Sequence, residues 1–152
     1  MMRPSIALAT ALLAVLSACA SSSHQKVPMP VESSAVRADS TRIYVGRRDQ
    51  VAGSWRNVRV FDNDREVGVL HEGEYLCWDR PAKQGVGRFI YEGLGFDQDA
   101  VEGFCELPAM PGGTVFLGIT VERDTRHPTV VRVEEPEGRA ALAKRKPAAT
   151  SK

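Results

Sequence analysis

The chain has 152 residues, with 20 basic and 19 acidic side chains and a formal net charge of +1 at pH 7. A charge so close to zero gives no global electrostatic reason to expect nucleic acid as a partner. Once the N-terminal segments described next are set aside, roughly 100 to 110 residues remain, enough for one hydrophobic core and too few for a second domain.

Residues 1–18 have the pattern of an export signal. Arg3 supplies a positive start, and an apolar run rich in Ala and Leu extends from Ile6 to Leu16 with one interruption at Thr10. This run has 11 residues, whereas a helix that spans a bilayer needs about 20. The sequence therefore predicts a signal peptide that is removed, not a permanent membrane crossing.

The apolar run ends in Leu16-Ser17-Ala18-Cys19, which resembles the lipobox of bacterial lipoproteins. The resemblance implies that Cys19 is the first residue of the mature chain, with a diacylglycerol on its sulfur and usually an acyl group on its nitrogen. Each buried methylene contributes about 0.8 kcal/mol, so two or three chains give stable membrane attachment. Ala20 after the cysteine implies the outer membrane, facing the periplasm. The alternative is a soluble secreted protein whose signal happens to contain a cysteine.

Residues 19–40 are expected to form the lipidated N-terminus and a flexible linker. The stretch after Cys19 is rich in Ser, contains Pro28 and Pro30, and shows no sustained periodicity. Such a spacer would hold the folded domain away from the membrane.

From Thr41 onward the sequence alternates apolar and polar residues in short runs, as half-buried strands do. The runs are "TRIYVGR", "RNVRVFD", "EVGVL", "EYLCWD", "GRFIY", "AVEGFCEL", "TVFLGITVE" and "PTVVRVE". About eight strands with regular turn signals predict an all-β fold, a single β-sandwich or small barrel over residues 41–134. The second and third runs are expected to form a hairpin, with Asp62-Asn63-Asp64 as a plain turn and not a calcium loop.

The C-terminal region has the signals of a short helix over residues 135–146. Pro136 lies near the expected start, and basic residues up to Lys146 occupy the last turn, which suits the helix dipole. Residues 147–152 are expected to be a disordered tail.

Four stretches together resemble a known group of proteins: "IYVGRR", "VRVFDNDREVGVLHEGEYLCWD", "TVFLGITVE" after a Gly-Gly turn, and "VRVEEPEGRAALAK". They are similar to small bacterial envelope lipoproteins with a domain of unknown function, a β-sandwich like carboxypeptidase-regulatory and PEGA modules. The resemblance covers roughly residues 41–146 and implies the fold but no catalytic residues. The segment "DRPAKQGVG" is longer than the corresponding turn of that group, which leaves the pairing of the fifth strand open.

Cys77 and Cys105 form an even pair in a chain expected in an oxidising compartment, which predicts a structural disulfide. They lie 28 positions apart on separate predicted strands, unlike the C-x-x-C spacing of a redox centre. A crosslink that closes such a loop would contribute about 3 to 4 kcal/mol to stability.

No catalytic residue, metal site or cofactor is predicted from the sequence. A G-x-S-x-G turn is absent from it. The histidines are His24, His71 and His127, and "HEGE" at His71 lacks the several ligands at short spacing that zinc needs. A hydrolase that uses one of these histidines is kept as an alternative.

A binding surface is expected around the first strand pair. Its basic residues are Arg47, Arg48, Arg56 and Arg59. These side chains could meet phosphate-bearing lipid or an acidic protein, although arginines beside a sheet also serve as solvated edge protection. Trp55 follows Gly53 and Ser54 in a predicted loop and is the aromatic candidate for an exposed contact, whereas Trp78 is expected in the core.

Together these features predict a lipid-anchored bacterial envelope protein that acts as a non-catalytic binding or assembly module. Its expected partners are the membrane, through the lipid, and an envelope protein that contacts an exposed sheet edge or loop end. One alternative resembles the lipoprotein inhibitors of hydrolases such as lysozyme, and the other is a periplasmic hydrolase. The sequence leaves the partner's identity and the oligomeric state open.

Overall fold

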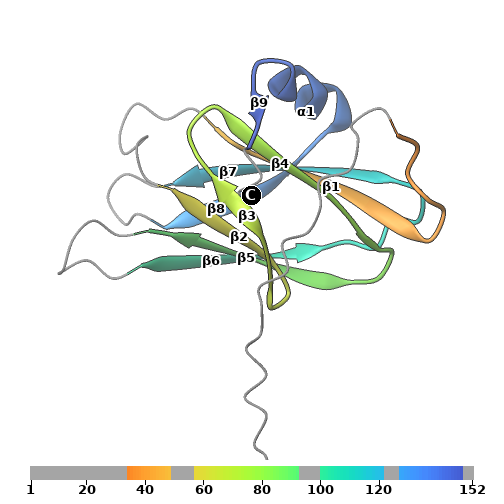
Figure 1. Ribbon diagram of the computed structural model, residues 1–152, viewed down its shortest axis with the longest axis horizontal. Coiled ribbons are helices and arrows are strands. Elements are labelled where there is room, and N and C mark those ends of the chain that lie inside the picture. Colours follow the sequence, from red (N-terminus) through yellow and green to blue (C-terminus); the bar gives the residue numbers. More distant parts are fainter. Residues whose placement is uncertain (1–33, 49–56, 93–99, 122–126, 149–152) are drawn as a thin grey trace, which may run out of the picture.

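The computed structural model describes residues 34–48, 57–92, 100–121 and 127–148. Two β-sheets face each other, and a helix lies on the outer side of one of them (Figure 1). Sheet A has the order β8-β7-β1-β4-β9, with bounds Pro128–Val133, Thr114–Val121, Ser40–Arg47, Glu74–Pro81 and Lys146–Pro147. Sheet B has the order β3-β2-β5-β6, with bounds Arg65–Leu70, Val58–Asp62, Gly85–Tyr91 and Val101–Leu107. Helix α1 spans Glu135–Leu142. The predicted all-β sandwich with a short C-terminal helix is confirmed, as two open sheets and not a barrel in the part described.

The strand pairing follows the sequence signals in some places and departs from them in others. β2 and β3 form the predicted antiparallel hairpin, and Asn63 in its turn has a φ of 53°, which Asn tolerates well. β5 pairs antiparallel with both β2 and β6, which answers the question that the sequence left open. β1 pairs parallel with β7, so that Tyr44 lies opposite Phe116. This parallel pair joins segments that are far apart in the chain. No turn connects them directly, so local sequence signals do not predict the pairing.

The core lies between the sheets and is built from the alternating apolar residues. Strand residues point alternately to the two faces of a sheet, so every second side chain enters the core. The largest fully buried apolar side chains are Trp78, Phe89, Ile43, Leu70, Leu107 and Ile119. The expectation that Trp78 belongs to the core is confirmed, since it is 1% exposed.

The C-terminal segment is more ordered than the sequence suggests. α1 ends at Leu142 instead of continuing to Lys146, because the chain turns there and enters β9 beside β4. The backbone N–H of Lys146 donates to Gly73 O at 3.1 Å, and Ala148 N–H donates to Tyr75 O at 2.8 Å. The expected disordered tail is therefore wrong for residues 147 and 148, and residues 149–152 lie outside the described part. None of the described helical residues forms a segment long and apolar enough for a bilayer crossing.

A second, smaller apolar cluster lies on the outer face of sheet A, under α1. The rings of Tyr44 and Phe116 stack at a centroid distance of 5.3 Å with an interplanar angle of 7°, and Tyr75 and Cys77 complete the cluster. Gly138 of α1 packs directly on Phe116, where an added Cβ would lie 2.5 Å from the ring carbon Cγ. The helix can lie this close to the sheet only because this position has no side chain.

We expect Gly138→Ala to lower the free energy of unfolding by about 1–3 kcal/mol, as overpacking does in a dense core. Helix propensity alone predicts the opposite sign, because Ala in a helix is about 1 kcal/mol more favourable than Gly. Urea denaturation measures the change, with the exposed Ala140→Gly as the matched helix control, expected to lose about 1 kcal/mol by propensity. A gain in stability for Gly138→Ala would contradict the close packing of α1 on Phe116.

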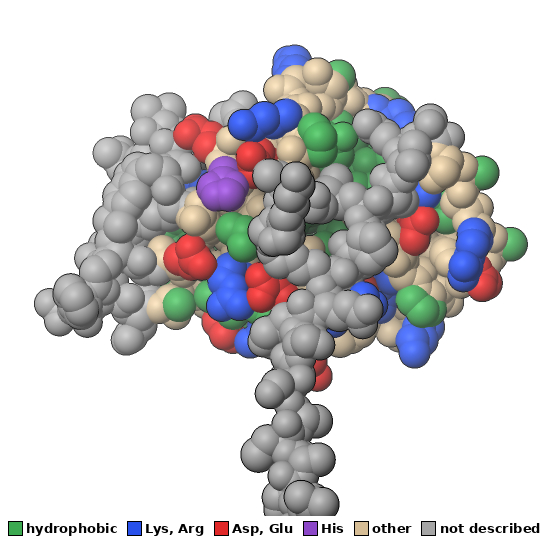
Figure 2. Space-filling model, viewed as in Figure 1, with side chains coloured by type: hydrophobic (Ala, Val, Ile, Leu, Met, Phe, Trp, Pro, Cys, Tyr) green, Lys and Arg blue, Asp and Glu red, His purple; other side chains and the backbone are tan. Residues whose placement is uncertain are grey.

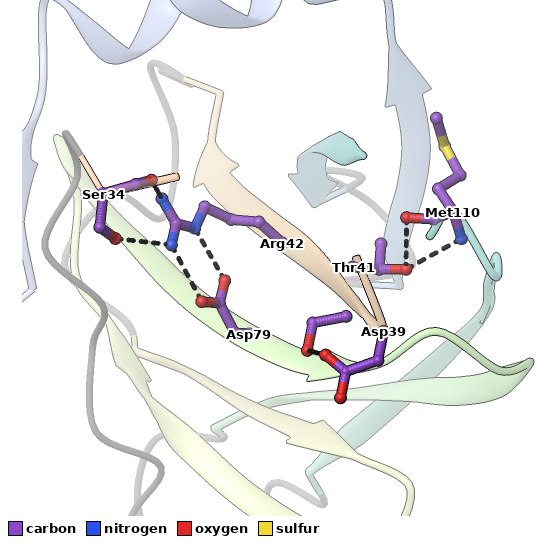
Figure 3. A network of polar contacts seen from close by, with 7 residues as sticks. Ser34, Asp39, Thr41, Arg42, Asp79 and Met110 are labelled. Atoms are coloured by element: carbon purple, nitrogen blue, oxygen red, sulfur yellow. Dashed lines mark hydrogen bonds and ion pairs between the residues drawn. The ribbon is translucent and has the colours of Figure 1, made fainter. Parts of the chain in front are cut away.

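The N-terminal end of the described chain is bound to the outer face of sheet A (Figure 3). Arg42 of β1 donates to both carboxylate oxygens of Asp79 in β4, at 2.7 and 2.9 Å. The same guanidinium donates to Ser34 O at 2.7 Å and to Ser34 Oγ at 2.9 Å. The expected flexible linker, residues 19–40, thus overlaps the folded structure from Ser34 onward, and residues 19–33 lie outside the described part.

The predicted disulfide between Cys77 and Cys105 is not formed, and neither cysteine is part of a disulfide in the structure. Cys77 belongs to the apolar cluster under α1, whereas Cys105 packs against the core between the sheets. The body of sheet A separates the two positions, so the side chains cannot meet without rebuilding a strand. Burial raises the pKa of the Cys105 thiol to about 11, which keeps it in the unreactive protonated form at neutral pH.

Candidate binding surface

The basic surface expected around the first strand pair is not one surface. Arg47 points inward at the end of β1, is 2% exposed, and its guanidinium carbon lies 5.8 Å from the centroid of the Tyr91 ring. Arg48 lies at the sheet A side, where it pairs with Glu137 at 3.2 Å. Arg59 is on sheet B, and the other two predicted residues, Trp55 and Arg56, lie outside the described part.

This prediction is wrong for Arg47 because strand alternation places it on the same side as the core residues Ile43 and Val45. Arg59 is separated from Arg48 because Arg48 follows β1 of sheet A, whereas Arg59 lies in β2 of sheet B. On the side of the molecule seen in Figure 2, basic and acidic side chains are interspersed, and neither sign forms a separate area.

The outer face of sheet B offers a better candidate, because it carries exposed apolar side chains. We call this surface the sheet B face. It is formed by outward residues of three adjacent strands: Arg59 and Phe61 of β2, Val86, Arg88 and Ile90 of β5, and Glu102, Phe104 and Glu106 of β6. Phe104 is 61% exposed and Val86 is 46% exposed, the two most exposed large apolar residues that the structure describes. An aromatic ring left this open on a sheet is a feature of contact surfaces.

The basic side chains of the sheet B face are held in place. The strand register puts Phe61, Arg88 and Phe104 in one row across the sheet. The guanidinium carbon of Arg88 lies 4.3 Å from the centroid of the Phe61 ring, and that of Arg59 lies 5.2 Å from it, within the range of cation–π attraction. Arg59 also pairs with Glu66 at 2.6 Å. The arginines therefore cover Phe61 and leave Phe104 open.

An open hollow of about 430 Å³ adjoins the apolar residues of the sheet B face, at the end of β6. The described residues that line it are Asn63, Gln84, Gly85, Val86, Glu106, Leu107 and Pro108. Glu106 is the only charged side chain in that set. The Asn63 amide oxygen accepts a hydrogen bond from Val86 N–H at 3.0 Å, and Asn63 N–H donates to Val86 O at 2.7 Å. These bonds hold the turn between β2 and β3 against β5, and both bonded residues line the hollow.

Sequence reasoning missed Phe104 and Glu106, although a signal was present. In "AVEGFCEL" the residues Val101, Gly103, Cys105 and Leu107 share the inward face. The opposite face then reads Glu102, Phe104 and Glu106, an aromatic residue between two acids on the side that should be polar. That break in the alternation is the signal that marks the surface.

Of the two described histidines, His71 has a partner that matters for stability. Its ring nitrogen Nδ1 lies 2.8 Å from Glu74 Oε2, and its backbone N–H donates to the same oxygen at 3.2 Å. Burial of the Glu74 carboxyl favours its neutral form, but the hydrogen bonds and charge of His71, helped by Lys146, outweigh burial and lower its pKa below 4.5. In the described residues, no group of three or more His, Cys, Asp or Glu side chains is arranged to hold a metal ion.

The lowered pKa of Glu74 predicts a pH dependence of folding. Its stabilising contribution is complete above the unfolded pKa of about 4.5 and is lost as the pH falls through the lower folded value. We expect Glu74→Gln to be less stable than the native protein at pH 7, with a difference that shrinks below about pH 4.5. Urea denaturation at several pH values measures this, and Glu72→Gln, an exposed neighbour, is the control. A difference that stays constant down to pH 3 would contradict the role of Glu74.

Comparison with models of known protein families, with curated proteins and with solved structures found no match. The resemblance to envelope lipoproteins of the sandwich type therefore stays a prediction from the sequence.

Proposed function

We propose that this protein is a lipid-anchored bacterial envelope protein whose sandwich binds a partner protein through the sheet B face, without catalysing a reaction. The N-terminal pattern that ends at Cys19 supports attachment to a membrane, with the outer membrane facing the periplasm as the proposed site. The single observation that supports binding is the exposure of Phe104, which is 61% exposed on β6.

The asymmetry of the sandwich favours this face over the other. The outer face of sheet A is occupied by α1, whose Gly138 packs on Phe116, and by Ser34 bound to Arg42. Sheet B has no described element packed on its outer face, and its apolar residues remain accessible. A surface aromatic residue with charged neighbours is the composition of the energetically important centre of many protein interfaces.

Membrane attachment is tested by replacing Cys19 with alanine in cells. The native protein is expected in the membrane fraction, with an intact mass that includes diacylglycerol and acyl chains and lacks residues 1–18. The Cys19→Ala variant is expected to carry no lipid. An unmodified thiol at Cys19 in the native protein would refute the anchor.

Binding through the sheet B face is tested by photo-crosslinking in the living envelope. A photoreactive amino acid replaces Phe104 in the full chain, and the matched control carries it at Val131, which is 38% exposed on the sheet A side. Specific crosslinks are expected from position 104 and not from position 131. Equal crosslinking from both positions, or none from position 104, would refute the proposed surface.

A further inference from the structure

The chemistry of the sheet B face indicates the kind of partner that it fits. β6 presents two carboxylates around its exposed aromatic ring, in the order Glu102, Phe104, Glu106. Phe104 lies directly opposite Arg88 on β5, and Val86 is its diagonal neighbour, close enough for both apolar side chains to contact one ligand group. A ligand would therefore meet apolar surface in the middle of β6 and a carboxylate group on each side of it.

The charges on this face are unequally available. Arg88 is 30% exposed at its side chain and is already engaged by the Phe61 ring and by Glu102 at 3.4 Å. Arg59 is engaged by Glu66. Glu106, by contrast, is exposed and has no ion pair with any described residue, and it is the one charged residue among the described residues that line the hollow. The charge that a partner meets beside Phe104 and Val86 is thus negative.

We infer that the hollow and the adjoining residues Phe104 and Val86 bind a cationic, partly apolar segment of a partner protein, with a lysine or arginine side chain in the hollow beside Glu106. Charge complementarity supplies the choice of partner, and burial of the Phe104 ring supplies the larger share of affinity. This inference rests on the proposed function, because it assigns the partner's chemistry to the same surface. An acidic or uncharged partner would leave the carboxylate of Glu106 desolvated without compensation.

The test uses the full chain, lipidated and purified in an uncharged detergent. Two probes are titrated: a short peptide of alternating lysine and leucine, and the same peptide with glutamate in place of lysine. The cationic probe is expected to bind at least about tenfold more tightly than the acidic one. Phe104→Ala is expected to weaken its binding at least about fivefold, and Glu106→Gln is expected to weaken it about threefold and to reduce its dependence on salt.

Matched controls exclude general attraction to the protein or the detergent. Val131→Ala removes an exposed apolar side chain from sheet A, and Glu72→Gln removes an exposed charge from the turn before β4, so both are expected to bind the probe as the native chain does. Circular dichroism confirms that each variant is folded.

Equal affinity for the two probes, no binding of either, or equal effects of the test and control substitutions would overturn the inference. The crosslinking from position 104 described above is read separately. Crosslinks there without preference for the cationic probe would refute only the partner's chemistry, whereas their absence would refute the proposed surface itself.

Discussion

Replacing Asp62 by alanine is expected to lower the free energy of unfolding by about 3–5 kcal/mol, because it leaves a buried guanidinium without its counter-charge. Asp62 ends β2 and turns its carboxylate inward at one end of the core. Its Oδ2 accepts hydrogen bonds from Arg80 Nε at 2.9 Å and from the Trp78 indole N–H at 3.0 Å. The side chain of Arg80 is 3% exposed and that of Asp62 is 12% exposed. Water therefore cannot take over these bonds without opening the sandwich.

The neighbouring backbone is adapted to this buried pair. A Cβ at Gly85 would lie 2.0 Å from Arg80 Nη2, so the guanidinium occupies the space of a side chain on β5. Arg80 also donates to the carbonyl of Lys83. Removal of Asp62 would leave these contacts in place. It would remove the negative charge and the acceptor for three donors, because Asp62 Oδ1 also accepts a hydrogen bond from Asn63 Nδ2 at 3.2 Å.

Urea denaturation measures the loss for Asp62→Ala. The matched control is Glu135→Ala, which breaks an exposed pair with Arg139, 58% and 63% exposed at their side chains, and should cost at most about 0.5 kcal/mol. If Asp62→Ala cost no more than that control, the Asp62–Arg80 pair would have to be accessible to water, which would contradict its burial at this end of the core.

The sequence was sufficient to predict the sandwich because burial of alternate residues is a local property. β7 reads Val115, Leu117, Ile119 and Val121 without a break, and all four side chains are buried. The role of Asp62 was not predictable, because its partners Trp78 and Arg80 lie 16 and 18 positions away on the opposite sheet. The neighbouring sequence indicates only that Asp62 belongs to a turn, and the structure has that turn between β2 and β3.

The error about the cysteines has a related cause. In "EYLCWDR" both faces of β4 are apolar, since Leu76 and Trp78 enter the core while Tyr75 and Cys77 lie under α1. The alternation of residues shows which side chains of a strand share a face. It does not predict which face lies between the sheets when a helix covers the other face. The candidate surface is hard to predict for the opposite reason, because Phe104 is an apolar residue on the face of β6 that the alternation makes polar.

A second large effect is expected at the pair of Arg42 and Asp79. Asp79→Ala should cost about 2–4 kcal/mol, somewhat less than a fully buried pair would, because the Asp79 side chain is 32% exposed while that of Arg42 is 3% exposed. Arg42→Leu should cost less than Asp79→Ala. Arg42→Leu removes the buried positive charge and leaves the Asp79 carboxylate, which water reaches. Asp79→Ala instead leaves the Arg42 guanidinium buried without its counter-charge. Urea denaturation of both variants gives the order, and the reverse order would contradict the burial of Arg42.

Arg42→Leu should also loosen the segment from Ser34 to Arg37, because the guanidinium supplies two of the hydrogen bonds that hold Ser34 on sheet A. Trypsin cleavage after Arg37 should then be faster than in the native chain, read by intact mass as a product that begins at Ala38. The control Arg139→Ala, which removes an exposed ion pair, should leave the cleavage rate unchanged. An unchanged cleavage rate for Arg42→Leu would show that other contacts hold the segment.

For a chain anchored at Cys19 as proposed, the bond at Ser34 limits the tether to about 50 Å at full extension. Under that proposal, the bonds of Arg42 to Ser34 help to set the distance from the membrane at which the sheet B face meets a partner.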